Sequence, residues 1–214
     1  MKVKVCGMRE PNNIQSVAAL SPDYMGFIFH PASPRYVADP SATITAKAHP
    51  SIQKVGVFVD VDLEEVLGKV AVYGLDMVQL HGSESPGFCA AVSGFVPVAK
   101  AFRVDADFDF GMTTGYEAAC DLFVFDARGA APGGNGIQYD WNLLQAYTGS
   151  TPFLLSGGIG PKDAAAVAQF SHQRFAGIDL NSGFETAPAN KDAALLEAFL
   201  EALNLLQHKN PNPA

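Results

Sequence analysis

The sequence predicts an α/β protein folded as a single (β/α)8 barrel, the TIM-barrel architecture. Eight short apolar runs recur along its 214 residues, and turn residues and helix-compatible stretches lie between them. The short, similar spacing of the runs favours a closed barrel over a long doubly wound sheet. A doubly wound sheet would also be expected to carry a GxGxxG fingerprint early in the chain, and the residues after Cys6 do not match one. We predict a barrel domain over residues 1–209 and a flexible tail over residues 210–214.

The apolar runs are predicted to be parallel strands. Several are nearly continuous in Val, Ile, Leu and Phe, which is typical of strands that are covered on both faces. In chain order the expected strands are 3–6, 24–29, 55–59, 77–80, 96–102, 122–125, 153–155 and 175–180.

Five stretches between the runs carry helix signals. They are 11–20, 62–73, 141–147, 164–170 and 192–206. Pro11 and Pro161 suit the first turn of a helix, Asp62 opens an acidic first turn, and Asp140 is placed as an N-cap. Gly74 is placed to end the second helix. Residues 105–119 contain two glycines and two adjacent threonines, so they predict a loop or an interrupted helix.

Composition and charge exclude several classes of protein. Lysine plus arginine number 14 against 22 aspartate plus glutamate, a formal net charge of −8, which has the wrong sign for a general nucleic-acid binder. The sequence contains no apolar run long enough for a membrane span, and charges interrupt the first residues too early for a signal peptide. The three cysteines form no CxxC pair, so the expected location is the reducing cytoplasm, with no membrane association.

The ligand of a parallel barrel meets the carboxyl ends of its strands. Polar or titratable residues stand at every expected strand exit: Cys6, His30, Asp60, Gln79, His81, Arg103, Asp126, Ser156 and Asp179. A chain that leaves a core becomes polar in any case, so the residue types carry more information than the pattern.

Two late loops are predicted to bind an anion. Residues 156–162 follow the seventh strand and contain Gly157 and Gly158, whose backbone N–H groups can approach a phosphate closely. Asn181, Ser182 and Gly183 follow the eighth strand and offer further donors. Phosphate held by the loops after strands seven and eight recurs in barrels of this kind, although ordinary turns are the alternative.

Cys6 and Asp126 end the first and sixth strands and are candidates for acid–base chemistry. A thiol serves as a base if its pKa is lowered, and a carboxyl group serves as an acid if burial raises its pKa. A small buried thiol and a turn-capping carboxylate are the structural alternatives. Arg35, in a proline-stiffened loop, can grip a carboxylate through two hydrogen bonds or simply face solvent.

The remaining cysteines, histidines and glycine-rich residues have less sequence support for a functional role. Cys89 and Cys120 have no such setting and are expected in the core. The glycine-rich residues 128–136 form either a lid or a disordered connection. The histidines lack ligand spacing, so we expect no metal.

Five segments, in order, resemble the phosphoribosylanthranilate isomerase family of tryptophan biosynthesis. They are 4–9 (KVCGMR), 26–29 with 33–37 (GFIF and SPRYV), 55–58 (VGVF), 78–82 (VQLHG) and 177–185 (GIDLNSGFE). No single match is specific, but together they span nearly the whole chain. The resemblance implies a (β/α)8 barrel that performs an Amadori rearrangement on a small phosphosugar without cofactor or metal.

The resemblance also implies roles for particular residues. The base is placed on Cys6 and the general acid on Asp126. Arg35 would hold the anthranilate carboxylate, and the glycines of the two late loops would bind phosphate. Gln79, His81 and Asp179 would line the pocket. Family members occur alone, as dimers and fused to a pathway neighbour, so we expect a monomer or a homodimer.

Two other readings stay open at this stage. One is a different phosphosugar barrel, either a metal-dependent epimerase or a synthase that uses Lys100. The other is a binding module in which Cys6 is an oxidisable thiol.

Overall fold

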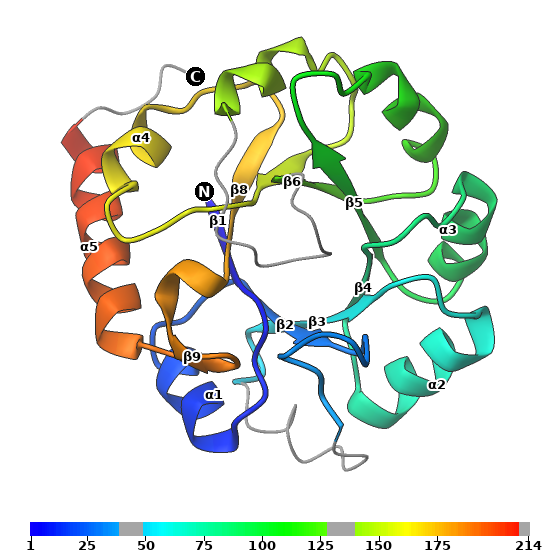
Figure 1. The fold of residues 1–214 in the computed structure, drawn as a ribbon, viewed down its shortest axis with the longest axis horizontal. Coiled ribbons are helices and arrows are strands. Elements are labelled where there is room, and N and C mark those ends of the chain that lie inside the picture. The colour runs from blue at the N-terminus through cyan, green and yellow to red at the C-terminus, as the bar shows by residue number, and fades with distance from the viewer. Residues whose placement is uncertain (39–48, 128–139, 210–214) are drawn as a thin grey trace.

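Eight parallel strands close into a barrel in sequence order, as predicted (Figure 1). The computed structural model describes residues 1–38, 49–127 and 140–209. The strands are β1 Lys2–Val5, β2 Tyr24–Ile28, β3 Gln53–Phe58, β4 Met77–Leu80, β5 Val98–Val104, β6 Leu122–Ala127, β7 Phe153–Leu155 and β8 Phe175–Leu180. Pairing of β1 with β8, which sets Lys4 opposite Asp179, closes the ring. The predicted tail and the glycine-rich loop lie outside the described residues.

Helices cover the outside of the barrel (Figure 1). They are α1 Pro11–Ala18, α2 Leu63–Tyr73, α3 Pro86–Ser93, α4 Ala164–Gln169 and α5 Ala193–Lys209. Three short 3₁₀ helices, Phe110–Tyr116, Trp141–Ala146 and Ser182–Phe184, and the hairpin of β9 Glu185–Ala187 with β10 Asn190–Lys191 complete the described elements. No helix in the described ranges is long and apolar enough to cross a membrane.

Local sequence signals fix several helix ends. The Asp62 carboxylate accepts a hydrogen bond from the Glu65 N–H, and Gly74 ends α2 in the left-handed conformation with φ 57°. Asp140 caps its segment as expected, but residues 141–146 wind as a 3₁₀ helix. Helix α4 begins at Ala164 as predicted, but Pro161 lies in a turn ahead of the helix rather than within its first turn.

Helix α3 was not predicted from the sequence. This helix begins with Ser85 as its N-cap and Pro86 in its first turn, and the Ser85 hydroxyl accepts a hydrogen bond from the Phe88 N–H. Ser-Pro was therefore a usable start signal. The helix has only eight residues, too few to show a clear apolar period.

Two apolar layers stabilise the barrel. A large cluster fills the space between the strands and the surrounding helices. A smaller one occupies the barrel interior and consists of Val55, Met77, Ala99, Ala101, Leu122, Val124 and Leu154. Its members on β4, β5, β6 and β7 precede polar residues by two or four positions, and this spacing determines what lines the mouth of the barrel.

Candidate active site

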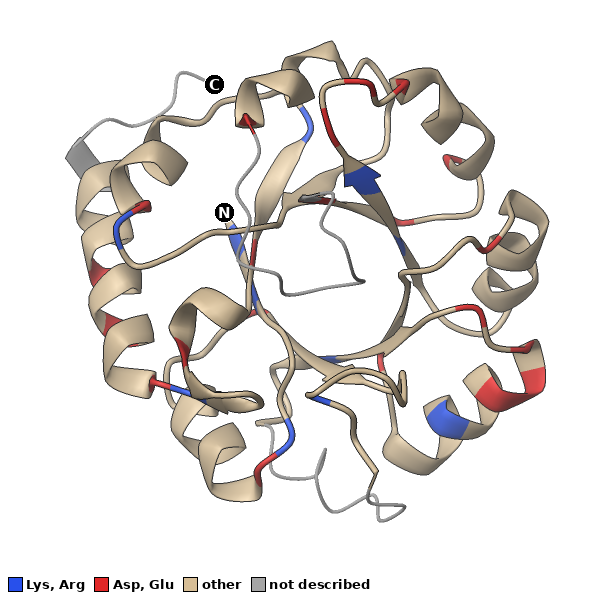
Figure 2. Ribbon diagram, viewed as in Figure 1, with Lys and Arg blue, Asp and Glu red and all other residues tan. Residues whose placement is uncertain are grey.

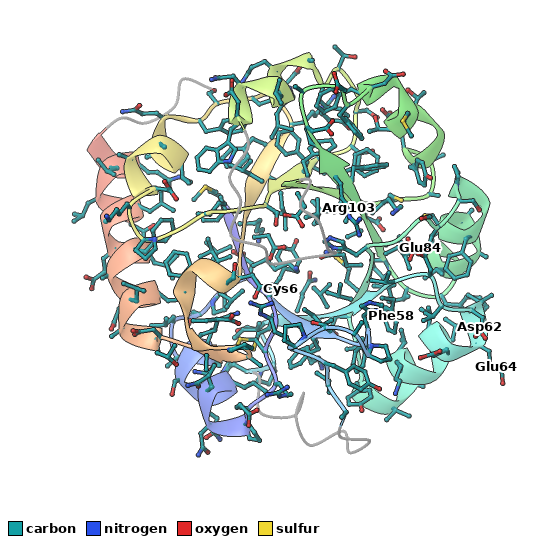
Figure 3. The ribbon with its side chains drawn as sticks, viewed as in Figure 1. Cys6, Phe58, Asp62, Glu64, Glu84 and Arg103 are labelled. Carbon is teal, nitrogen blue, oxygen red and sulfur yellow. The ribbon has the colours of Figure 1, made fainter. Side chains whose placement is uncertain are left out.

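Strand alternation builds a polar layer directly above the apolar interior. Successive side chains of a strand point to opposite faces, so every second residue shares one face. Ala101 on β5 is followed by Arg103, Val124 on β6 by Asp126, and Leu154 on β7 by Ser156. On β4, Met77 is followed by Gln79 and then His81; on β1, Lys4 and Cys6 share a face. Figure 3 shows Cys6 and Arg103 on different strands around the mouth.

A buried ion pair joins the first and last strands. Lys4 Nζ lies 3.0 Å from both oxygens of Asp179, and the two side chains are 2% and 6% exposed. Burial lowers the pKa of Lys4, but the Asp179 carboxylate and the Cys6 thiol together raise it above its ordinary value. The Lys4 ammonium is therefore held in its charged form beside the Asp179 carboxylate. Lys4 was not singled out in the sequence, although it stands two residues before Cys6.

Cys6 is buried beside this pair. Cys6 stands two residues after Lys4 on the same face of β1, and the Lys4 ammonium and the Cys6 thiol shift each other's pKa. Burial raises the pKa of the Cys6 thiol above its ordinary value, with Lys4 and Lys191 opposing and Asp179 adding to the rise. The lowered pKa that a resting thiolate base requires is thus absent, and Cys6 rests as a neutral thiol. The same burial argues against an oxidisable sensor thiol, which needs low pKa and exposure.

Asp126 lies in a cluster with three polar side chains. His81 Nε2 lies 3.3 Å from Asp126 Oδ2 without hydrogen-bond geometry. The Gln79 amide nitrogen lies 2.8 Å from His81 Nδ1, an assignment that places the proton of a neutral His81 ring on Nε2, facing Asp126. The Ser156 hydroxyl lies 3.3 Å from Asp126 Oδ1 and 3.4 Å from Asp179 Oδ2. The predicted acid and the Lys4–Asp179 pair therefore share one serine.

Arg35 is held by an acid that the sequence analysis did not identify. The guanidinium, 8% exposed, lies 2.6 Å from Glu185 Oε2 through Nη2 and 2.9 Å from Oε1 through Nε. Lys191 Nζ pairs with the same carboxylate at 2.5 Å and donates to Asn181 Oδ1 at 2.7 Å. Burial alone would raise the pKa of Glu185, but these two cations hold it below its ordinary value. Burial lowers the pKa of Lys191 against the opposing effect of Glu185, so Arg35 is the lasting positive charge at this place.

The two predicted phosphate loops meet in space. Gly183 packs against the Ile159 carbonyl oxygen, with space for no more than a hydrogen atom there. Gly157 and Gly158 have φ of 89° and 71°, a left-handed conformation that suits glycine. Successive N–H groups in turns of this kind can form an anion-binding concavity. Ser182 begins the short helix Ser182–Phe184. The Gly160 N–H is already bonded to Asp163 at 2.7 Å, so it is not a free donor.

Lys100 is committed to structural bonds. Its ammonium donates to the carbonyl oxygens of Leu80, Gly82 and Ala101 at 2.8–3.2 Å and pairs with Glu84 at 3.2 Å. Such a saturated ammonium is poorly suited to act as the catalytic lysine of a synthase. No group of three or more His, Cys, Asp or Glu side chains within the described ranges is arranged to hold a metal ion.

Gly26 on β2 makes room for the Cys6 side chain. A Cβ at this position would lie 2.6 Å from Cys6 Sγ and 3.1 Å from Cys6 Cα. We expect Gly26→Ala to displace the thiol, lower kcat and cost about 1–3 kcal/mol of stability, as overpacking does. Steady-state kinetics and urea unfolding measure both effects.

The matched control is Gly68→Ala on α2, where a Cβ meets nothing within 4 Å. There alanine should stabilise by about 0.5–1 kcal/mol through helix propensity and leave kcat unchanged. Equal kinetics for the two variants would contradict the assigned role of Gly26.

Comparisons with known proteins converge on one family. A family model for N-(5'-phosphoribosyl)anthranilate (PRA) isomerase matches residues 3–202. The N-(5'-phosphoribosyl)anthranilate isomerase of Phocaeicola vulgatus is 45% identical over 204 residues, covering 95% of this chain and 98% of the relative.

Solved structures agree with the sequence match. The phosphoribosyl anthranilate isomerase of Thermus thermophilus superposes with a TM-score of 0.86 at 31% identity, covering 96% of this chain and all of that one. Another phosphoribosyl anthranilate isomerase, in complex with reduced 1-(o-carboxyphenylamino)-1-deoxyribulose 5-phosphate, is 26% identical with a TM-score of 0.82, covering 95% and 98% of the two chains. The resemblance seen in the sequence is confirmed: the chain belongs to the phosphoribosylanthranilate isomerase family.

Proposed function

We propose that the chain converts N-(5-phosphoribosyl)anthranilate to 1-(2-carboxyphenylamino)-1-deoxyribulose 5-phosphate, with Cys6 as base and Asp126 as acid. The observation that carries the assignment is connectivity. Cys6 and Lys4 share one face of β1, Lys4 pairs with Asp179, and Ser156 lies between Asp179 and Asp126. Both reacting groups therefore line one side-chain network at the mouth of one barrel, as a reaction on one sugar requires.

The chemistry needs one proton donor and one acceptor. Asp126 gives its proton to the ribose ring oxygen, the C1–O bond breaks, and the nitrogen lone pair forms a protonated Schiff base. The Cys6 thiolate then removes the proton from C2, which yields an enolamine. Loss of the C2 hydroxyl proton and protonation of C1 give the ketone. No electron leaves or enters the substrate, so the reaction calls for no cofactor, and we propose none.

The remaining assignments follow the charges of the substrate. Arg35, which Glu185 holds in place, offers its guanidinium charge and N–H donors to the anthranilate carboxylate. Gly157, Gly158, Asn181, Ser182 and Gly183 offer backbone and side-chain donors to the phosphate. Gln79 Oε1 and His81 Nε2 are buried without a hydrogen-bond partner in the described part of the chain, so they are candidates to contact the sugar.

The proposed function has a direct assay. Freshly prepared phosphoribosylanthranilate is mixed with purified protein, and the loss of its anthranilate fluorescence is followed. We expect turnover without added metal or cofactor and in the presence of a chelator. If fluorescence is lost no faster with the protein than in its absence, the proposal is overturned.

Arg35 provides a test of how the substrate is oriented. We expect Arg35→Gln to raise KM for phosphoribosylanthranilate by about 10- to 100-fold, since a hydrogen bond to a charged group contributes about 1.5–3 kcal/mol. An analogue that carries aniline in place of anthranilate lacks the carboxylate, so wild type and variant should bind it equally. A KM difference that is the same for both compounds would place Arg35 outside the carboxylate site.

The partners are proposed on the same grounds. Basic positions stand singly around the ribbon in the view of Figure 2, which gives no support to a nucleic-acid surface. Among solved neighbours, monomers derived from the dimeric isomerase of Thermotoga maritima align at 27% identity and a TM-score of 0.81. A monomer or a homodimer is therefore proposed here, and cytoplasmic location stays the expectation from the sequence.

A further inference from the structure

One turnover leaves the two reacting groups in the wrong protonation states. Asp126 has given a proton to the ring oxygen, and Cys6 has taken one from C2. In the final tautomerisation the substrate loses one proton and gains one, so that step cancels. The protein is left with a Cys6 thiol and an Asp126 carboxylate. Before the next substrate reacts, one proton must pass from sulfur to carboxylate.

We infer that Lys4, Asp179 and Ser156 form an internal proton path that returns this proton from Cys6 to Asp126. The inference rests on the proposed roles of its two end groups. Its middle members are placed by geometry alone. Lys4 Nζ lies 3.0 Å from both Asp179 oxygens.

Ser156 supplies the last link of the path. Its hydroxyl lies between the two carboxylates, 3.4 Å from Asp179 Oδ2 and 3.3 Å from Asp126 Oδ1. At the other end of the path, Cys6 follows Lys4 by two residues on the same face of β1, so the thiol lies beside the ammonium. Every neighbour along the path is therefore a donor, an acceptor or both.

Each transfer along this path balances. The Lys4 ammonium gives a proton to Asp179 and takes the thiol proton, so it remains an ammonium. Protonated Asp179 gives its proton to Ser156 Oγ, whose own proton passes to Asp126 Oδ1. In total one S–H bond breaks and one O–H bond forms. Lys4, Asp179 and Ser156 end as they began, and no oxidant or reductant is involved.

Burial limits the exchange of protons between these groups and bulk water, so an internal path is needed. Lys4, Asp179 and Ser156 are 1%, 6% and 7% exposed, and Cys6 is 4% exposed. Burial also raises the pKa of Asp179, against the opposing effect of Lys4, which makes this carboxylate a better temporary proton acceptor. Because Cys6 rests as a thiol, the same path generates the reactive thiolate and acid together. Lys191 on β10 also lowers the pKa of the Cys6 thiol and so favours the thiolate.

Ser156→Ala tests the path with the smallest change. It removes one oxygen and leaves Cys6, Asp126 and the Lys4–Asp179 pair in place. We expect kcat to fall by about tenfold, less than the roughly 10²- to 10⁴-fold of losing a direct acid or base, since water can still carry the proton. Imidazole buffer should restore kcat in a concentration-dependent manner after product leaves the mouth. The solvent deuterium isotope effect on kcat should also increase.

Matched variants separate this role from a structural one. Ser156→Thr keeps the hydroxyl and should retain most of kcat without imidazole. Ser93→Ala removes an exposed hydroxyl bonded to the Ala90 carbonyl at the end of α3, and its kcat should equal that of wild type at every imidazole concentration. If Ser156→Ala does not fold, Ser156→Cys fills the same space with a poor proton carrier and replaces it.

The value of kcat in Ser156→Ala decides whether the path exists. An unchanged kcat in Ser156→Ala, or a lowered kcat that imidazole does not raise, overturns the path. Neither result touches the proposed function, because wild type would still consume phosphoribosylanthranilate. If wild type itself shows no turnover, the proposed function fails, and the path fails with it.

Discussion

Cys6→Ala and Asp126→Asn are each expected to lower kcat by about 10²- to 10⁴-fold, the contribution typical of a positioned base or acid. Alanine cannot accept the C2 proton, and asparagine cannot protonate the ring oxygen. Because neither substitution changes the backbone, both proteins should fold and bind a reduced product analogue. Fluorescence turnover and calorimetric binding measure the two properties separately.

The chain offers a control for each of these variants. Cys120→Ala removes another buried thiol, before β6, at the opposite end of the strand from Asp126. Asp121→Asn changes a carboxylate that accepts the Val98 N–H at 2.9 Å, also before β6. Both controls should keep kcat within a small factor of wild type. Near-normal kcat in Cys6→Ala and Asp126→Asn would refute the assignment of base and acid.

Lys4→Met is expected to cost about 3–5 kcal/mol of folding stability. It leaves the Asp179 carboxylate buried without its partner, and an uncompensated buried charge is strongly destabilising. Replacing both members, as in Lys4→Met with Asp179→Leu, removes the charge altogether. The double variant should therefore recover most of the stability that the single variant loses. Urea unfolding of all three proteins measures the free energies.

An exposed ion pair made by another lysine of β1 serves as the control. Lys2 Nζ lies 2.7 Å from Asp23 Oδ1, with the side chains 56% and 31% exposed. Water screens such a pair, so Lys2→Met should cost no more than about 1 kcal/mol. Equal losses for Lys2→Met and Lys4→Met would show that burial does not set the strength of the inner pair.

Much of the barrel was predictable because local physics dictates it. Nearly continuous apolar runs bounded by turn residues, such as 153–155, are typical of strands covered on both faces. The acidic turn after Asp62 and the glycine at position 74 define α2 from the sequence alone, and the structure confirms both ends. The interrupted helix predicted within 105–119 is confirmed by the short 3₁₀ helix Phe110–Tyr116. The short helix α3 was missed and the type of the helix at 141–146 was wrong, because these segments are too brief to show a period.

The site was predictable only in part. Cys6, Asp126 and Asp179 stand at strand ends, where a parallel barrel binds its ligand, so the sequence could nominate them. Glu185 and Lys191 follow the last barrel strand, in a segment for which the sequence predicts no helix or strand. Arg35 is 150 residues from Glu185 in the chain, so no local signal links the two side chains. Every second residue of a strand points to the same face, so Lys4, two residues before Cys6, could have been predicted to lie beside it.

Periodicity, turn residues and recurrent motifs act between near neighbours, so the sequence by itself determined the barrel, its order of strands and the kinds of groups at the mouth. Tertiary structure decided the rest. Closure of β1 against β8 set Lys4 opposite Asp179 and buried that pair beside Cys6. The neighbouring ends of β6, β7 and β8 brought Ser156 between Asp126 and Asp179. Desolvation and distance are properties of the assembled barrel, because they depend on side chains that only folding brings together.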